Sequence, residues 1–279
     1  MDDRGGQNLE VTSEEAQVRA TRTKALADAQ PRPVVLVLHQ EQSTPGHIGN
    51  TLSALGHPLD IRRPRFGDPL PETLADHDGA VIFGGPMSAN DPDDYITRET
   101  DWIGVALQEN APFLGVCLGA QMLARHLGAS VSRHPDGFVE IGYHDLEPRP
   151  GTPELAGGAP WPTRAYQWHS EGFTLPDGAE PLVVGGNAFP NQAFRVGRTA
   201  YGIQFHPEIT YAMVARWSGH NSEKLTQAGA QARPAQMRDH IAHGRAVRRW
   251  LWVFLQTWVN EGRRARGVPA LPARSFAGV

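Results

Sequence analysis

The stretch that decides the fold is FLGVCLGAQMLARHLG, residues 113–128. It opens with apolar residues typical of a buried strand and continues in an apolar helical pattern, which its last glycine ends. Gly115 and Gly119 flank Cys117 between the two. This G-x-C-x-G spacing matches a nucleophile elbow, where the backbone turns so sharply that side chains at the glycine positions would clash. The stretch therefore predicts an α/β fold that exposes Cys117 at a turn.

Strand and helix patterns alternate along the first half of the chain. An uninterrupted valine and leucine run at residues 34–38 is typical of a strand buried on both faces of a parallel sheet. A helical pattern follows at residues 48–55, and extended patterns follow at 59–61 and 80–83. A second helical pattern occupies residues 102–107. This alternation predicts a flavodoxin-like, doubly wound and mostly parallel sheet. From residue 138 onward, turns rich in Gly and Pro separate short extended segments, which predict additional antiparallel strands.

Length and composition exclude several classes of protein. The chain has 279 residues, of which 40% are hydrophobic and 20% charged, and this excludes a wholly disordered, collagen-like or coiled-coil chain. The net charge of -4 provides no global basic field, so we expect no nucleic-acid partner. A single cysteine excludes an internal disulfide and a cysteine-rich zinc site. No apolar segment has the length of a signal peptide or a membrane span, so we expect a cytoplasmic protein without a membrane partner.

The chain is predicted to consist of a domain between two tails. Residues 1–32 are polar and predict a tail with a short helix over 13–29. Residues 33–260 form the domain, and 261–279 form a frayed second tail. The end of the domain, about 236–260, carries apolar residues at helical spacing and predicts an amphipathic helix. Its apolar face packs on the domain in one interpretation and forms a dimer surface in the other.

A histidine and a carboxylate suited to activate the cysteine stand close together in QFHPE, residues 204–208. His206 precedes proline, which favours extended backbone, and residues two apart in an extended chain project to the same side. Glu208 can therefore hold one imidazole nitrogen while the other faces Cys117. A strand predicted at 202–205 delivers the pair to the sheet end where open α/β folds place their sites. Taken alone, the triplet would also fit a surface turn with a solvated histidine.

Gly84 and Gly85 are candidates for an oxyanion-binding loop. Acyl transfer builds negative charge on an oxygen, and backbone N–H groups must stabilise that charge. Glycine lets the backbone approach the oxygen closely, and the N–H of Gly85 and that of Leu118 form the predicted pair of donors. A plain turn at the end of the strand at 80–83 is the alternative interpretation.

Three segments together resemble the class I glutamine amidotransferase family. They are GGPMSAND, GVCLGAQ and QFHPEIT, at residues 84–91, 115–121 and 204–210, in the order expected for the family. The resemblance covers about residues 34–215 and implies the class I glutamine amidotransferase fold. Further segments, at residues 167–169 and 190–195, resemble the stand-alone branch that is similar to the amidotransferase domain of GMP synthase.

The resemblance implies both a reaction and a set of substrate contacts. The reaction is release of ammonia from the γ-amide of glutamine through a γ-glutamyl thioester, carried out by a triad of Cys117, His206 and Glu208. The substrate contacts implied are Gln121, which lies near the bound glutamine, and Gln167 and His169 at the rim of its pocket.

Two departures limit what the resemblance implies. Ser170 and Glu171 follow His169, where the stand-alone branch usually has glycine and aspartate, so the rim of the pocket is altered. A complete GMP synthase carries an ATP-pyrophosphatase domain with a serine- and glycine-rich phosphate loop, and nothing here resembles it. We therefore expect no ATP use and no cofactor. The spacing of the histidines predicts no metal site either.

The sequence leaves several functions open. The leading hypothesis is hydrolysis or transfer at the γ-glutamyl amide bond, with glutamine as substrate and a synthase partner that receives the ammonia. A γ-glutamyl peptidase acting alone on γ-glutamyl conjugates is the second. The third is a partner-gated amidotransferase subunit with little activity alone, whose arginine-rich C-terminal helix docks the partner. A cysteine hydrolase without γ-glutamyl specificity is a further interpretation.

Overall fold

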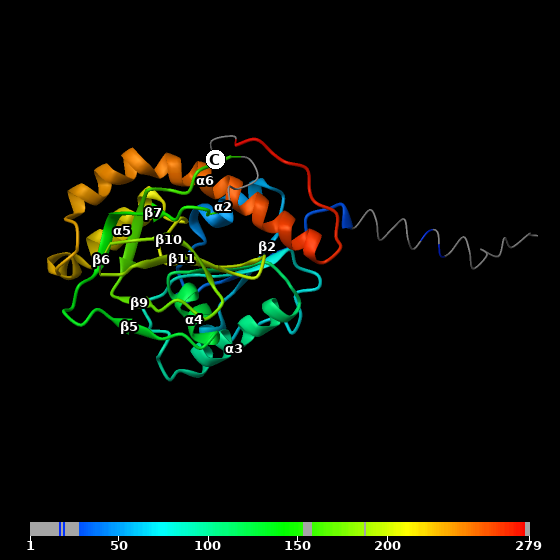
Figure 1. Cartoon of the computed structure of the whole chain (residues 1–279), viewed down its shortest axis with the longest axis horizontal. Helices are drawn as coiled ribbons and strands as arrows, with labels where there is room; N and C mark the ends of the chain where they lie inside the picture. The colour runs from blue at the N-terminus through cyan, green and yellow to red at the C-terminus, as the bar shows by residue number, and fades with distance from the viewer. Residues whose placement is uncertain (1–16, 18, 20–27, 153–157, 187, 277–279) are drawn as a thin grey trace, which may run out of the picture.

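An eight-stranded sheet forms the centre of the computed structural model, which describes residues 17, 19, 28–152, 158–186 and 188–276 (Figure 1). The strand order is β2-β1-β3-β4-β12-β11-β10-β7. These strands are β1 (Val34–Val37), β2 (Leu59–Arg62), β3 (Gly79–Ile82), β4 (Phe113–Val116), β7 (Glu147–Pro148), β10 (Glu180–Val184), β11 (Asn191–Val196) and β12 (Ala200–Ile203).

The sheet is parallel on one side and antiparallel on the other. Strands from β2 through β12 in that order pair in parallel, and β11, β10 and β7 continue the sheet antiparallel. Two smaller antiparallel sheets pair β5 (Val131–Arg133) with β9 (Glu171–Phe173) and β6 (Glu140–Asp145) with β8 (Arg164–His169). The predicted doubly wound, mostly parallel sheet with additional antiparallel strands is confirmed.

Helices cover both faces of the sheet, as the alternation of strand and helix requires. In Figure 1, α2 (Gly46–Ala54) and α6 (Arg233–Ala265) lie above the sheet, and α3 (Asp94–Gln108) and α4 (Leu118–His126) lie below it. Two apolar clusters fill the layers: in β1, Leu36 packs on the α6 side and Val37 on the α3 side. Both residues are fully buried, which explains why the strand sequence is continuously apolar. Further helices in the described part of the chain are α5 (Tyr211–His220), η1 (Pro64–Phe66) and η2 (Ser222–Thr226).

The long C-terminal helix α6 packs on the sheet of its own chain. Trp250, Leu251 and Trp258 are buried in the apolar cluster between α6 and the sheet. The apolar face of the helix therefore packs on the domain, as in the first of the two interpretations. The helix extends beyond the predicted 236–260 at both ends. The fraying expected from about Gly262 is wrong for the described residues, because Arg263 is fully buried and donates to both carboxylate oxygens of Asp78 at 2.8 Å.

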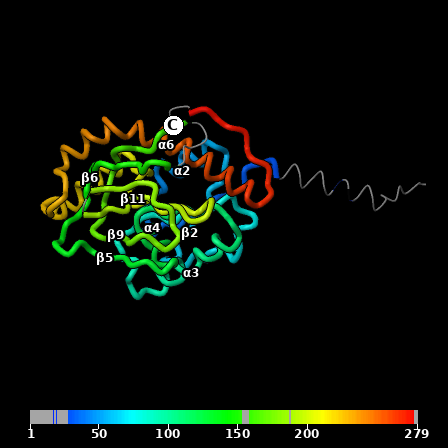
Figure 2. Tube along the Cα trace, viewed as in Figure 1, coloured from blue at the N-terminus to red at the C-terminus, as the bar shows by residue number. Residues whose placement is uncertain are grey.

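The segment after α6 also packs against the domain. Figure 2 shows it running back along α6 toward the C-terminal mark. Trp252 Nε1 donates to the Arg274 carbonyl at 2.9 Å, and Leu271 N–H donates to Asn260 Oδ1 at 2.7 Å. Most of the tail predicted at 1–32 lies outside the described residues. Among the helices of the part that is described, none has the length and apolar character needed to span a membrane.

Candidate active site

Cys117 occupies a sharp turn between β4 and α4. Its φ angle is 51°, which lies in the left-handed region. This conformation is unfavourable for any residue that has a Cβ, so the turn is strained at Cys117. A Cβ on Gly115 would collide with the backbone of Gly119, and a Cβ on Gly119 would collide with the Ile82 carbonyl of β3. Both glycines are therefore required by close backbone approach. The predicted strand–turn–helix geometry around Cys117 is present.

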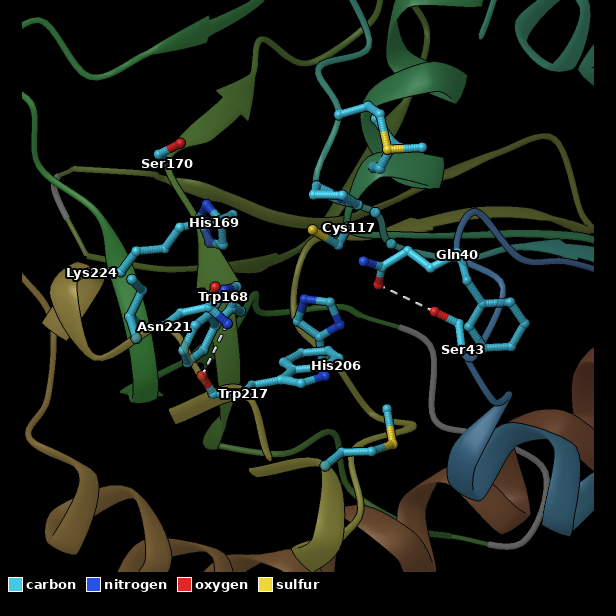
Figure 3. Close-up of a pocket in the computed structure, with 18 of the residues that line it drawn as sticks. Gln40, Ser43, Cys117, Trp168, His169, Ser170, His206, Trp217, Asn221 and Lys224 are labelled. Atoms are coloured by element: carbon cyan, nitrogen blue, oxygen red, sulfur yellow. Dashed lines mark hydrogen bonds between the residues drawn. The ribbon is translucent and has the colours of Figure 1, made fainter. Parts of the chain in front are cut away.

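Strand β12 brings His206 to this turn. It pairs in parallel with β4, and the N–H of Cys117 donates to the Ile203 carbonyl at 2.8 Å. The chain then continues to His206, whose N–H donates to the Tyr166 carbonyl of β8 at 2.8 Å. A Cβ on Gly84 would lie 2.9 Å from His206 Cε1 and 3.8 Å from Cys117 Sγ, so the cysteine and the histidine meet over the same glycine. Figure 3 shows the two side chains on the same part of a cavity wall.

His206 and Glu208 form the predicted contact. Nδ1 of His206 lies 2.7 Å from Oε1 of Glu208, and each side chain is 3% exposed. Burial alone would lower the pKa of His206, but the charges of Glu208 and Cys117 outweigh it and raise that pKa to about 10. Nε2 of His206 is buried and has no ideal hydrogen-bond partner among the described residues, and the nearby Cys117 side chain helps to raise the pKa of the ring. The ring also packs edge-on against Trp217, with centroids 5.1 Å apart.

The backbone of Glu208 is fixed by the start of α2. The N–H of His47 donates to the Glu208 carbonyl at 2.8 Å. Gly46, at φ 51°, approaches the same carbonyl so closely that a Cβ there would collide with it. Downstream, Thr210 caps α5 by accepting from the Met213 N–H at 3.2 Å. Glu208 is thus held between two helix starts, which limits the positions open to its carboxylate.

The two glycines after β3 lie beside Cys117, as an oxyanion loop requires. Gly84 and Gly85 both line the cavity that holds Cys117. Leu118 is the first residue of α4 and lines the same cavity. N–H groups in the first turn of a helix have no partner within the helix. The structure therefore brings the predicted donors, Gly85 and Leu118, to the edge of one cavity.

The cavity measures about 800 Å³. Its lining includes Cys117, His206 and Gln121. Figure 3 shows Gln40 and Ser43 on one side of Cys117, with Lys224 and Asn221 on the other. This volume lies in the upper part of the range typical of small-molecule sites.

Of the three residues expected to contact the substrate, two line the cavity and one does not. Gln121 lines the cavity, and its Nε2 donates to the Glu171 carbonyl at 2.9 Å. His169 also lines it, and its Nδ1 donates to the same carbonyl at 2.9 Å. Gln167 differs, because it is fully buried away from the cavity lining and donates to Gln192 Oε1 at 2.6 Å. Gln167 therefore does not line this cavity.

Several cavity residues were missing from the sequence prediction. Trp217 and Lys224 come from α5 and from η2, and neither element was expected. Thr210 before an apolar run was the signal for α5, since threonine is a preferred N-cap. No cluster of three or more histidine, cysteine or acidic side chains able to hold a metal ion is found in the described part of the chain.

The fold and the site define an α/β protein with a cysteine at a nucleophile elbow and a histidine–carboxylate pair beside it. The sequence model of the family Glutamine amidotransferase class-I matches residues 37–213. This chain belongs to the class I glutamine amidotransferase family.

Individual relatives agree with that membership. The glutamine amidotransferase-like protein YfeJ of Salmonella typhimurium is 28% identical over 211 residues, 70% of this chain and 83% of that protein. The GMP synthase of Porphyromonas gingivalis is 33% identical over 145 residues, 51% of this chain but only 27% of that enzyme. A glutamine amidotransferase structure from Methylobacillus flagellatus superposes with a TM-score of 0.76 at 27% identity, covering 88% of this chain and 99% of that one. Family membership supports glutamine amidotransferase-type activity.

Proposed function

We propose that this chain hydrolyses the γ-amide of glutamine with Cys117 as nucleophile. His206 takes the thiol proton of Cys117, whose Sγ attacks the amide carbon, and the carbonyl oxygen becomes an oxyanion that accepts hydrogen bonds from the N–H groups of Gly85 and Leu118. His206 Nε2 gives its proton to the departing nitrogen, which leaves as ammonia, and a γ-glutamyl thioester remains. Water then gives a proton to His206 and attacks the thioester, which releases glutamate and restores Cys117.

The raised pKa of His206 supports this order of events. At about 10, it leaves the imidazole protonated at neutral pH, so a proton is available when the amide nitrogen departs. Glu208 holds Nδ1 at 2.7 Å, which leaves Nε2 as the nitrogen that exchanges the proton. The observation that carries the proposal is the meeting of Cys117 and His206 over Gly84 at the wall of one cavity.

Labelling with an electrophilic glutamine analogue tests the assignment of the nucleophile. We expect one covalent adduct per chain, on Cys117, that excess glutamine prevents and that does not form in Cys117→Ala. Labelling by an electrophile without a γ-glutamyl group at the same rate would instead indicate a cysteine hydrolase of another specificity. Absence of any labelling would contradict the proposal.

The cavity favours a second candidate, cleavage of γ-glutamyl amides with larger leaving groups. Its end formed by α5 and η2 is cationic and aromatic, with Arg216, Trp217 and Lys224 in its lining. Lys224 is half-buried and forms no ion pair within the described residues. A carboxylate on the leaving amine, as in a γ-glutamyl amino acid, would supply the missing negative partner.

Variants of Lys224 separate the two candidates. Lys224→Met should raise the KM for γ-glutamylglycine about tenfold relative to that for uncharged γ-glutamyl methylamide, because one charge-assisted hydrogen bond is lost. Lys224→Arg keeps the charge and serves as the matched control. Equal effects on both substrates would assign Lys224 to the glutamyl half, and no effect on either would remove this candidate's support.

A partner that receives the ammonia remains part of the proposal. This chain matches about a quarter of the length of the Porphyromonas gingivalis enzyme named GMP synthase [glutamine-hydrolyzing]. A separate synthase would then supply what the rest of such an enzyme contains. Labelling of Cys117 without turnover of either substrate would favour this partner-gated form, and co-purification of a synthase would support it.

A further inference from the structure

A buried histidine–glutamate pair lies directly behind the glycine loop. His39 follows β1, Glu99 belongs to α3, and both side chains are completely buried. His39 Nε2 lies 2.7 Å from Glu99 Oε2, and His39 Nδ1 lies 3.1 Å from the Gly84 carbonyl oxygen. Neither His39 nor Glu99 lines the cavity, and Oε1 of Glu99 has no hydrogen-bond partner in the described part of the chain. The mechanism proposed above makes no use of the pair.

The contacts fix where the protons lie. A carbonyl oxygen only accepts hydrogen bonds, so Nδ1 of His39 carries a proton and donates it to Gly84. Nε2 faces a carboxylate, and a further proton lies between His39 and Glu99. A buried carboxylate is unstable unless it is paired. Breaking the contact between His39 and Glu99 would leave the Glu99 carboxylate buried without a partner, so this contact is strongly favoured. Glu99 therefore locks the ring of His39 in the orientation that reaches Gly84.

The bond to Gly84 also fixes the direction of the next N–H group. The C=O of Gly84 and the N–H of Gly85 belong to one planar trans peptide, in which they point in opposite directions. Because the carbonyl points toward His39, the N–H of Gly85 points away from it, and Gly85 itself lines the cavity. A peptide between two glycines rotates more freely than any other, so this direction needs an external anchor.

His39 also packs against the loop from behind. A Cβ on Gly85 would lie 3.1 Å from His39 Cβ and 3.2 Å from Nδ1, tighter than ordinary contact. The loop therefore has the imidazole on one side and the Cys117–His206 pair, which faces Gly84, on the other.

We propose that His39 and Glu99 are positioning residues that hold the Gly84–Gly85 peptide with its N–H directed at the oxyanion. The inference rests on the proposed function, because it assumes that an oxyanion forms beside Cys117. The pair touches neither substrate nor the reacting atoms, and its effect reaches the reaction only through the glycine peptide.

Two substitutions of His39 separate its hydrogen bond from its volume. In His39→Asn the amide nitrogen stands as many bonds from Cα as Nδ1 does, so it still reaches the Gly84 carbonyl. His39→Leu fills similar space without a donor. We expect His39→Leu to lower kcat for glutamine about 100-fold with a smaller change in KM, as loss of an oxyanion donor does, and His39→Asn to recover most of that loss. Glu99→Gln should lower kcat by a smaller factor.

A matched control is available at the other end of the sheet. His57 is also buried, with Nδ1 3.0 Å from the Arg32 carbonyl and 3.4 Å from Asp78 Oδ2. It does not line the cavity that holds Cys117. His57→Leu should lower the melting temperature as much as His39→Leu does and leave kcat unchanged.

Two chemical probes distinguish a positioning role of His39 from a merely structural one. Addition of Cys117 to glutamate γ-semialdehyde forms a tetrahedral adduct whose oxygen needs the oxyanion donors, whereas alkylation by iodoacetamide displaces iodide and forms no oxyanion. We expect His39→Leu to weaken aldehyde inhibition by the same factor as kcat/KM and to leave the alkylation rate unchanged. Rescue of aldehyde inhibition in His39→Asn completes the prediction.

The outcomes that overturn the inference differ from those that overturn the proposed function. Folded His39→Leu with wild-type kcat and aldehyde inhibition, or with parallel loss of aldehyde inhibition and alkylation, contradicts the positioning role while the triad stands. If His39→Leu does not fold, unchanged aldehyde inhibition in Glu99→Gln contradicts it in the same way. Failure of the wild-type chain both to bind the aldehyde and to release glutamate contradicts the proposed function and the inference with it.

Discussion

The negative charge of Glu208 sets the proton affinity of His206. The substitution Glu208→Gln removes this charge without changing the size of the side chain. Burial of His206 opposes its protonation, and the charge of Glu208 is the largest effect that raises the pKa to about 10. Once that charge is lost, only Cys117 still favours the proton. We expect the pKa of His206 to return to near its ordinary value of 6.5.

The size of the effect follows from those two values. With a pKa of about 10, protonated His206 outnumbers the neutral form by about 300 to 1 at pH 7.5. With a pKa of 6.5, only about one molecule in ten keeps the proton at that pH. The acid form needed to release ammonia therefore falls about tenfold at pH 7.5, and the alkaline limb of kcat moves down by about 3.5 pH units.

The pH profile of kcat for glutamate release, measured from pH 6 to 10.5, reads this shift directly. Titration of the ¹⁵N-labelled imidazole, assigned with His206→Gln, gives the pKa independently. An alkaline limb at the same pH in wild type and Glu208→Gln would refute the reasoning.

The same shift makes a prediction about stability. A histidine whose pKa is higher in the folded state stabilises the fold fully below its unfolded value of 6.5 and loses that effect as pH rises toward 10. The free energy of unfolding of the wild type should therefore fall between pH 7 and 10. Glu208→Gln should lack most of that slope in urea titrations, and an equal slope in both proteins would contradict the assigned pKa.

Further predictions concern the elbow and the C-terminal helix. Gly119→Ala places a Cβ against the Ile82 carbonyl, so the turn must shift; we expect loss of Cys117 labelling by the glutamine analogue and a lower melting temperature, and a fully labelled variant would contradict the elbow geometry. Arg263→Met leaves Asp78 buried without its main partner and should cost about 3–5 kcal/mol in denaturant unfolding, with kcat of the remaining folded protein unchanged. A loss below about 1 kcal/mol would show that this buried pair contributes little.

Local sequence was sufficient to predict the elbow and the histidine–glutamate contact. Gly115 and Gly119 stand within two residues of Cys117, and His206 stands two residues from Glu208, so chain geometry alone fixes these relations. The continuous apolar run of β1 was readable for a similar reason, because a strand buried on both faces has no polar side to interrupt it.

Contacts between residues that are distant in the sequence could not be predicted from local sequence patterns. His39 and Glu99 are sixty positions apart, and no local pattern marks either as the partner of the other. The tail expected from residue 261 was wrong for the same reason: its polar composition gave no sign that Arg263 pairs with Asp78, which precedes β3. Gln167 shows the limit of a motif, since its position in the segment 167–169 did not reveal that it turns away from the cavity.

The most direct measurement is release of glutamate from L-glutamine by wild type and Cys117→Ala, quantified by mass spectrometry and with both proteins confirmed as folded. The proposed mechanism predicts glutamate and ammonia in equal amounts from the wild type and none above background from the variant. Glutamate released by Cys117→Ala at the wild-type rate would contradict it.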